Sequence, residues 1–219
     1  HSPSQDTTVR VVGGAEDGAT VRLYTSADCG SEVAALGTAE QFASPGISVN
    51  VAPNATTRIY ARATDAAGNV SPCSSSGLLY VADSVAPATP YGLKLSSNGP
   101  ANNNKVRITG AAESGTAVQV FANAACSGAP LAEASAEVFG AQGPEVPVAD
   151  DSITTFFVRA VDVAGNVSSC SETGVTYIED SLAPEAPILA GFSVASPANQ
   201  NSIRVAGSAE TGATIRLFA

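Results

Sequence analysis

The feature that most constrains the fold of this chain is an internal repeat with a period of 97 residues. The stretches "VRVVGGAEDGATVRLY", "VRITGAAESGTAVQVF" and "IRVAGSAETGATIRLF" begin at Val9, Val106 and Ile203, so the offsets are 106 − 9 = 97 and 203 − 106 = 97. Solenoid units are shorter, about 20 to 50 residues, whereas about 100 residues form a whole β-sandwich with its own core. We therefore expect a row of separate domains.

The composition predicts that these domains are built of short strands and turns. Apolar residues make up 44% of the chain but aromatic residues only 5%, and 20 glycines and 13 prolines interrupt the apolar stretches. Such a mixture is typical of all-β proteins. In the best-defined unit, alternation and turn residues predict strands at 91–96, 105–111, 117–122, 131–138, 145–148, 154–162 and 174–180.

Two proline-containing stretches mark the expected domain boundaries. "VADSVAPATP" (81–90) and "IEDSLAPEAP" (178–187) each follow an apolar strand and carry two prolines three residues apart, which stiffen the chain and cannot donate ladder hydrogen bonds. The boundaries give a unit at 1–83 that lacks its first strand, a complete unit at 84–180, and the N-terminal part of a third at 181–219. Such a short third piece cannot bury a core alone. We therefore expect the chain to be a window on a longer array.

The charge of the chain narrows its partners. With 20 acidic and 10 basic side chains, the formal net charge is −10. Nucleic acids and anionic membranes select clustered Lys and Arg, so neither is expected as a partner. The sequence also lacks the run of about 18 apolar residues that a membrane-spanning helix needs. Divalent cations suit this surface better.

Three motifs together resemble a known family. "GAAESGTAVQVF", "RAVDVAGNVS" and "DSLAPEAP" are similar to stretches of the bacterial immunoglobulin-like repeats of large secreted adhesins and surface stalk proteins. The resemblance covers essentially the whole chain. It implies an all-β fold of tandem immunoglobulin-like (Greek-key) β-sandwich domains, a secreted or cell-surface location, and neighbouring repeats of the same chain as the immediate partners.

The motif Asp-x-Ala-Gly-Asn occurs at Asp65 and again at Asp162, where each long strand is expected to reverse. Glycine and asparagine tolerate positive φ, and an aspartate accepts hydrogen bonds from amides two residues on, so the motif can form a hairpin without any ligand. The alternative is that the two aspartates also donate oxygens to calcium, which takes six to eight oxygen ligands. One aspartate cannot form such a site.

The family resemblance supplies companions for a calcium site, because some members rigidify their domain junctions with calcium. In an immunoglobulin-like sandwich, the turns near Glu113 and Asp162 lie at the pole that faces the preceding domain. The implied ligands are Asp83, Glu113 and Asp162 at the first junction, and Glu179, Asp180 and Glu210 at the second. No stretch has the dense Asp-x-Asp-x-Asp spacing of a dedicated calcium loop. Each glutamate before a turn glycine can equally be a solvated carboxylate.

The four cysteines come two per unit, at equal spacing: 73 − 29 = 44 and 170 − 126 = 44. A zinc or redox site is not expected, because the sequence has no C-x-x-C and no internal histidine. Repeat symmetry favours one disulfide within each unit, Cys29 with Cys73 and Cys126 with Cys170, and bridges between chains are the alternative. The two cysteines of a unit are expected at opposite ends of the sheet, so one flanking segment must fold across its edge.

These observations favour a structural role and argue against catalysis. His1 is the only histidine, and the acidic pair Asp150-Asp151 has no counterpart at Pro53-Asn54 in the first unit. We expect a spacer or stalk segment of a long bacterial extracellular protein. The alternatives are a self-assembling extracellular fibre, linked by strand exchange or disulfides, and a glycan- or protein-binding module. Whether a neighbouring chain supplies the first strand missing from 1–83 would discriminate between them.

Overall fold

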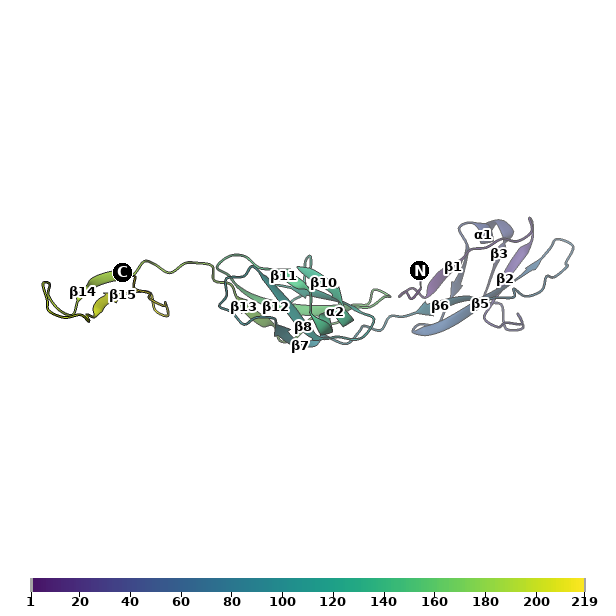
Figure 1. Cartoon of the computed structure of the whole chain (residues 1–219). Coiled ribbons are helices and arrows are strands. Elements are labelled where there is room, and N and C mark those ends of the chain that lie inside the picture. The colour runs from purple at the N-terminus through teal and green to yellow at the C-terminus, as the bar shows by residue number, and fades with distance from the viewer. Residues whose placement is uncertain (1, 219) are drawn as a thin grey trace.

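A computed structural model describes residues 2–218 as a row of antiparallel sheets (Figure 1). Two sandwiches follow one another, and a small two-stranded sheet lies at the C-terminal end, drawn in yellow. The predicted all-β sandwich fold is confirmed. Neither helix in the described part of the chain is long and apolar enough to cross a bilayer.

The second sandwich consists of a three-stranded sheet packed face to face against a four-stranded sheet. The first sheet has the order β11-β8-β7 and consists of β7 (Tyr91–Leu95), β8 (Lys105–Ala111) and β11 (Glu145–Pro147). The second has the order β10-β9-β12-β13 and consists of β9 (Ala117–Phe121), β10 (Ala132–Ser135), β12 (Ile153–Val161) and β13 (Val175–Ile178). Apolar side chains from both sheets, such as Ile108, Val120 and Phe156, meet in one buried core.

One strand prediction in this unit is wrong in its second half. The expected strand at 131–138 ends at Ser135, and helix α2 (Ala136–Ala141) follows at once. The Ser135 hydroxyl accepts a hydrogen bond from the backbone N–H of Val138 and so caps the helix. Ala136 and Phe139, three residues apart on one helical face, are buried, and Phe139 joins the core.

The first sandwich repeats this plan with one strand fewer. Strands β1 (Thr8–Val11) and β4 (Ile47–Asn50) form a two-stranded sheet. The facing sheet has the order β3-β2-β5-β6, and helix α1 lies between β3 and β4. These elements are β2 (Thr20–Tyr24), β3 (Ala35–Thr38), α1 (Ala39–Ala43), β5 (Ala55–Thr64) and β6 (Leu78–Ala82). Within residues 2–83, no strand corresponds to β7 of the second sandwich.

The C-terminal part contains a single two-stranded sheet. Strands β14 (Ile188–Phe192) and β15 (Val205–Ser208) pair with each other, and no second sheet covers them in the described residues. Every residue of β14 is exposed, although its sequence is as apolar as that of a core strand. This part is therefore a hairpin without a core.

Candidate functional site

The turn after β5 is organised by a single carboxylate. Asp65 Oδ1 accepts hydrogen bonds from the backbone N–H groups of Ala67 (2.9 Å) and Asn69 (2.7 Å), and Oδ2 accepts one from the Asn69 side-chain amide (2.8 Å). The bond from the Asn69 side chain is the main reason that the pKa of Asp65 lies below its ordinary value. Both carboxylate oxygens therefore serve the turn, as the hairpin interpretation of the motif expects.

The turn after β12 has the same three hydrogen bonds to its aspartate and one further hydrogen bond to the first sandwich. Asp162 accepts from Ala164 N–H (2.8 Å), Asn166 N–H (2.9 Å) and the Asn166 side chain (2.8 Å). Burial pushes the pKa of Asp162 upward, but these hydrogen bonds outweigh it and the pKa is lowered. The Asn166 amide also donates to the backbone carbonyl of Asp83, 3.0 Å away. This turn thus reaches the end of the first sandwich.

Further side chains hold the first linker. Glu113, in the turn between β8 and β9, accepts a hydrogen bond from Ala88 N–H at 2.9 Å. From the other domain, Asn54 Oδ1 accepts from both the N–H (2.7 Å) and the hydroxyl (2.9 Å) of Ser84. The linker is therefore bonded to both of its neighbours.

The second linker carries the same contacts 97 residues later. Asp151 takes the place of Asn54 and accepts hydrogen bonds from the N–H (2.9 Å) and hydroxyl (3.3 Å) of Ser181. Glu210 Oε2, the counterpart of Glu113, accepts from Glu185 N–H at 3.4 Å. Both junctions are thus built on one pattern of polar contacts.

The acidic residues proposed as calcium ligands are engaged at the first junction by the protein's own amides. Asp83 Oδ1 accepts from Val85 N–H (3.0 Å), while Glu113 and Asp162 accept from linker and turn amides. Among residues 2–218, no three His, Cys, Asp or Glu side chains are grouped so as to hold a metal ion. The structure therefore places these residues around the linker without gathering their carboxylates.

The second junction contains one acidic side chain with unused bonding capacity. Glu179 is only 2% exposed, and its Oε2 accepts from Asp151 N–H (2.6 Å) and the Ser181 hydroxyl (3.2 Å). Its Oε1 is buried and has no hydrogen-bond partner. Asp180 and Glu210, the other acidic residues predicted there, are exposed. Glu179 Oε1 is thus the one carboxylate oxygen in the described residues that is buried without a hydrogen-bond partner.

Each sandwich contains one disulfide. Cys29 bonds Cys73 and Cys126 bonds Cys170, with Cα–Cα distances of 5.8 and 5.7 Å. In the second unit, Arg159 of β12 donates to the Cys126 carbonyl (3.1 Å), which draws the loop after β9 back over the sheet. The folded-back loop therefore brings Cys126 close enough to Cys170 for a disulfide within the same unit.

The return segment that carries the second cysteine is not a regular strand. The N–H groups of Ser168 and Ser171 donate to the carbonyls of Ala160 and Val158, as ladder partners would. The Ser168 and Ser171 hydroxyls then accept from the N–H groups of Ala160 (2.8 Å) and Val158 (3.1 Å). These serines were missed in the sequence, although they recur in the first unit at Ser71 and Ser74, which make the same bonds.

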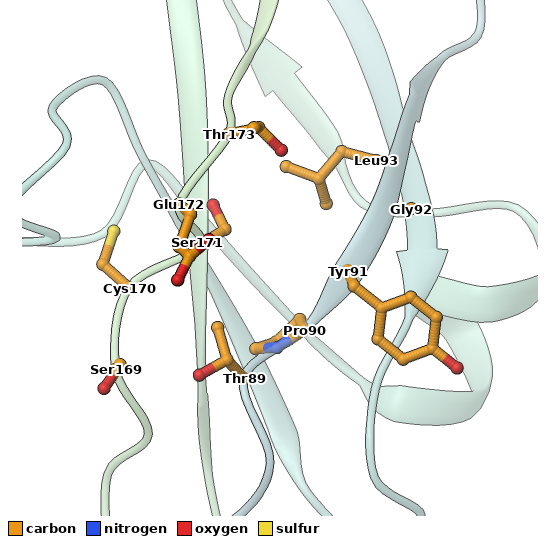
Figure 2. Close-up of a pocket in the computed structure, with 10 residues that line it drawn as sticks. All are labelled: Thr89, Pro90, Tyr91, Gly92, Leu93, Ser169, Cys170, Ser171, Glu172 and Thr173. Atoms are coloured by element: carbon orange, nitrogen blue, oxygen red, sulfur yellow. The ribbon is translucent and has the colours of Figure 1, made fainter.

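A shallow groove of about 360 Å³ lies between the start of β7 and the return segment (Figure 2). It is lined by residues 89–93 and 169–173. Leu93 points toward Thr173 across the groove, whereas the Tyr91 ring, 70% exposed, points away. The lining offers apolar side chains, hydroxyls and the carboxylate of Glu172, and no hydrogen bond pairs one of these hydroxyls with that carboxylate.

Comparisons with known proteins find likeness in fold alone. No family model matches the chain, and no curated protein matches it. The FN1–FN3 domains of chicken CNTN1 align with a TM-score of 0.47 and 12% identity over 76% of this chain, which spans about half (55%) of that chain. The fibronectin(III)-like modules of Clostridium thermocellum CbhA align with a TM-score of 0.46 and 16% identity, over 82% of this chain and 92% of theirs. The BSP domain of a biofilm associated protein aligns with a TM-score of 0.26 and 16% identity, over 76% of this chain and 25% of that chain.

Proposed function

We propose that this chain is a spacer or stalk segment of a long bacterial extracellular repeat protein. The observation that carries the proposal is the first junction, where the linker is bonded to the domain on each side. Asn166 of the second sandwich donates to the Asp83 carbonyl, and Asn54 of the first accepts from Ser84. Because each contact restrains the linker against one domain, together they limit bending between the two.

The path of the chain through the second sandwich also suits a spacer. The chain enters at one pole and leaves at the other, so successive units lie end to end (Figure 1). Ala101 pairs in parallel with Glu179: its N–H donates to the Ile178 carbonyl and its carbonyl accepts from Asp180 N–H, both at 3.2 Å. A force applied along the two linkers would load both of these hydrogen bonds at the same time, in shear. Such an arrangement resists extension better than one in which the bonds break one after the other.

The disulfides support the extracellular location. Bonds of this kind persist in oxidising compartments and are rare in the cytosol. Closing a loop of 44 residues contributes about 4 kcal/mol in the chain-entropy model, a large share of the stability of a small domain. Calcium at the junctions, as the family resemblance implies, would stiffen the array further, and Glu179 is its most favourable ligand.

A recognition module is the second candidate, and one observation favours it. Tyr91 exposes its ring beside the groove of about 360 Å³, and aromatic rings on a surface are common anchors for partners. The groove is shallow, however, and four of the other aromatic side chains of this unit, Phe121, Phe139, Phe156 and Tyr177, are buried in its core, while Phe157 is partly buried. The spacer role is therefore the better supported.

Small-angle X-ray scattering of the whole chain tests the spacer role. A spacer is expected to give a narrow distribution of maximum dimensions that matches the end-to-end arrangement. A broad distribution with many bent or compact forms would contradict it. Binding of a glycan array or of host proteins by the isolated chain, lost on Tyr91→Ala, would instead favour recognition.

A further inference from the structure

The outer face of the four-stranded sheet in the first sandwich carries two arginines side by side. Arg22 of β2 lies directly opposite Arg62 of β5, and Leu36 of β3 lies opposite Arg22 on its other side. The neighbours of Arg22 along β2, Val21 and Leu23, are buried in the core, so this row of three side chains faces outward. Like charges directly opposite each other destabilise a sheet. The pair is therefore unfavourable unless an anion lies beside it.

The same row in the second sandwich is balanced in charge. Glu133, Gln119 and Arg159 occupy these positions, since 133 − 36 = 97, 119 − 22 = 97 and 159 − 62 = 97. Gln119 Oε1 accepts a hydrogen bond from Arg159 Nε (2.9 Å), and the Gln119 amide donates to the Glu133 carboxylate (2.8 Å). This chain of hydrogen bonds thus links the single arginine of the row to a carboxylate.

The first sandwich lacks both acceptors of that chain. Arg22, which has donors only, stands at the position of Gln119. Leu36, 64% exposed, stands at the position of the Glu133 carboxylate. The Nε of Arg62 is buried and has no hydrogen-bond partner. The row therefore carries two positive charges and no acceptor, whereas its counterpart carries one charge of each sign.

The carboxylates of the first sandwich do not neutralise the two arginines. Arg22 donates to the Thr64 hydroxyl (3.0 Å), and Arg62 donates to the backbone carbonyl of Asp28 (3.4 Å). The Asp28 carboxylate accepts from Gly30 N–H (2.9 Å) instead. In the described part of the chain, both ion pairs lie in the second sandwich. Arg22 and Arg62 are partly exposed, so an anion from solution can reach them.

A third arginine extends the positive surface along β5. Arg58 is exposed and lies on the same face as Arg62, because residues separated by an even number of positions in a strand share a face. The two are about 13 Å apart along the strand at 3.3 Å per residue. We call the surface formed by Arg22, Leu36, Arg58 and Arg62 the arginine face. Its length suits a polymer with repeated anionic groups better than a single small ion.

We propose that the arginine face binds an acidic polysaccharide, with one carboxylate or sulfate group of the polymer seated between Arg22 and Arg62. Such an oxyanion accepts hydrogen bonds from both guanidinium groups, and so replaces the acceptors that Gln119 and Glu133 supply in the second sandwich. The centre of the face is charged, whereas the core of a protein interface is depleted in charge. A hydrated polysaccharide therefore suits it better than an acidic protein.

The net charge of −10 does not prevent this contact. At physiological ionic strength, exposed charges are screened beyond about 8 Å. The arginines beside the bound group therefore act on it more strongly than the carboxylates elsewhere on the chain. This inference goes beyond the spacer role and does not depend on it.

Isothermal titration calorimetry of the 219-residue chain tests the proposal. The probes are short galacturonate oligomers, which carry carboxylates, and sulfated dextran oligomers, with neutral dextran and polyglutamate for comparison. We expect at least one of the two acidic sugars to bind and the affinity to fall as salt is added. No binding of either, or equal binding of neutral dextran, would overturn the proposal. Binding of polyglutamate alone would assign the face to an acidic protein segment and overturn it too.

Arg22→Gln is the sharpest variant, because it copies the arrangement of Gln119 in the second sandwich. It should weaken binding at least about tenfold, as expected for the loss of one charge-assisted hydrogen bond. The melting temperature of the first sandwich should not fall, because the new side chain can accept from Arg62 Nε. Arg10→Gln is the matched control, since it removes the same charge from β1 in the other sheet. Equal losses in the two variants would show that only net charge matters, and would overturn the site.

Transplanting the row gives an independent test. Gln119→Arg combined with Glu133→Leu places the first sandwich's row in the second. This double variant should bind two oligomers per chain where the original chain binds one. An unchanged number of sites in a folded double variant would contradict the arginine pair as the binding element.

Discussion

The side-chain amide of Asn166, in the second sandwich, donates a 3.0 Å hydrogen bond to the backbone carbonyl of Asp83, at the end of the first. The same amide donates to Asp162, so one of its hydrogens holds the turn and the other holds the junction. Asn69, its counterpart in the first sandwich, donates to Asp65. One turn motif therefore forms a hairpin in both copies and docks a domain in the second.

Replacing Asn166 should loosen the first junction. Asn166→Ala removes the bond to Asp83 and one turn bond, whereas Asn69→Ala removes only the equivalent turn bond. Each variant should lower the stability of its own domain by about 1 kcal/mol. Only Asn166→Ala should broaden the distance distribution between spin labels placed on the two sandwiches. Equal distributions for the two variants would show that this contact does not restrain the linker.

The lowered pKa values of Asp65 and Asp162 predict a loss of stability in acid. Each folded pKa lies below the unfolded value of about 3.9, so the stabilisation is present above that pH and is lost as the pH falls through the folded pKa. Asp162→Asn cannot ionise and should therefore lose less stability than the original chain between pH 7 and pH 2. Melting temperatures of the two proteins, recorded at several pH values in this range, measure the difference in stability loss. Parallel curves for the two proteins would contradict the assignment.

The sequence predicted most strands correctly. The repeat indicates where each strand lies, and the alternation of apolar residues indicates which of its side chains point into the core. It missed α2 because the helix has only six residues, too few for the spacing of Ala136 and Phe139 to establish a helical period in the sequence. The motif predicted the amide contact that Asp162 makes within its own turn. The sequence could not show that Glu113 is occupied, because its partner, the N–H of Ala88, lies 25 residues away in the linker.

The serines of the return segment should be more important for stability than their polarity suggests. Ser168→Ala or Ser171→Ala leaves a buried N–H of β12, that of Ala160 or Val158, without its hydroxyl partner. Each change should destabilise the second sandwich by about 1 to 3 kcal/mol. Ser169→Ala is the control, because Ser169 is exposed and contributes only its backbone carbonyl. Denaturant unfolding compares the three, and equal midpoints would mean that water replaces the hydroxyls.

Calcium binding at the second junction would depend on Glu179, whose buried Oε1 has no partner. We expect calcium to raise the melting temperature of the original chain relative to chelator, by an amount equivalent to about 2.7 kcal/mol at a hundred times the dissociation constant. Glu179→Gln should abolish this rise, and Glu172→Gln, at an exposed position of the same unit, should not. A melting temperature that calcium leaves unchanged in the original chain would remove the metal hypothesis.

The disulfides should set how far each sandwich lengthens under tension. Cys126 and Cys170 are 44 residues apart, so the intact bond keeps that loop out of the stretched chain. At about 3.4 Å per extended residue, reduction should lengthen the unfolding step of the second sandwich by roughly 150 Å. The first sandwich should change equally, because its bond spans the same 44 residues. Single-molecule force spectroscopy with and without reductant measures the steps. Steps that do not change would show that the cysteines are not paired within their units, and the array would then have no covalent limit on its extension.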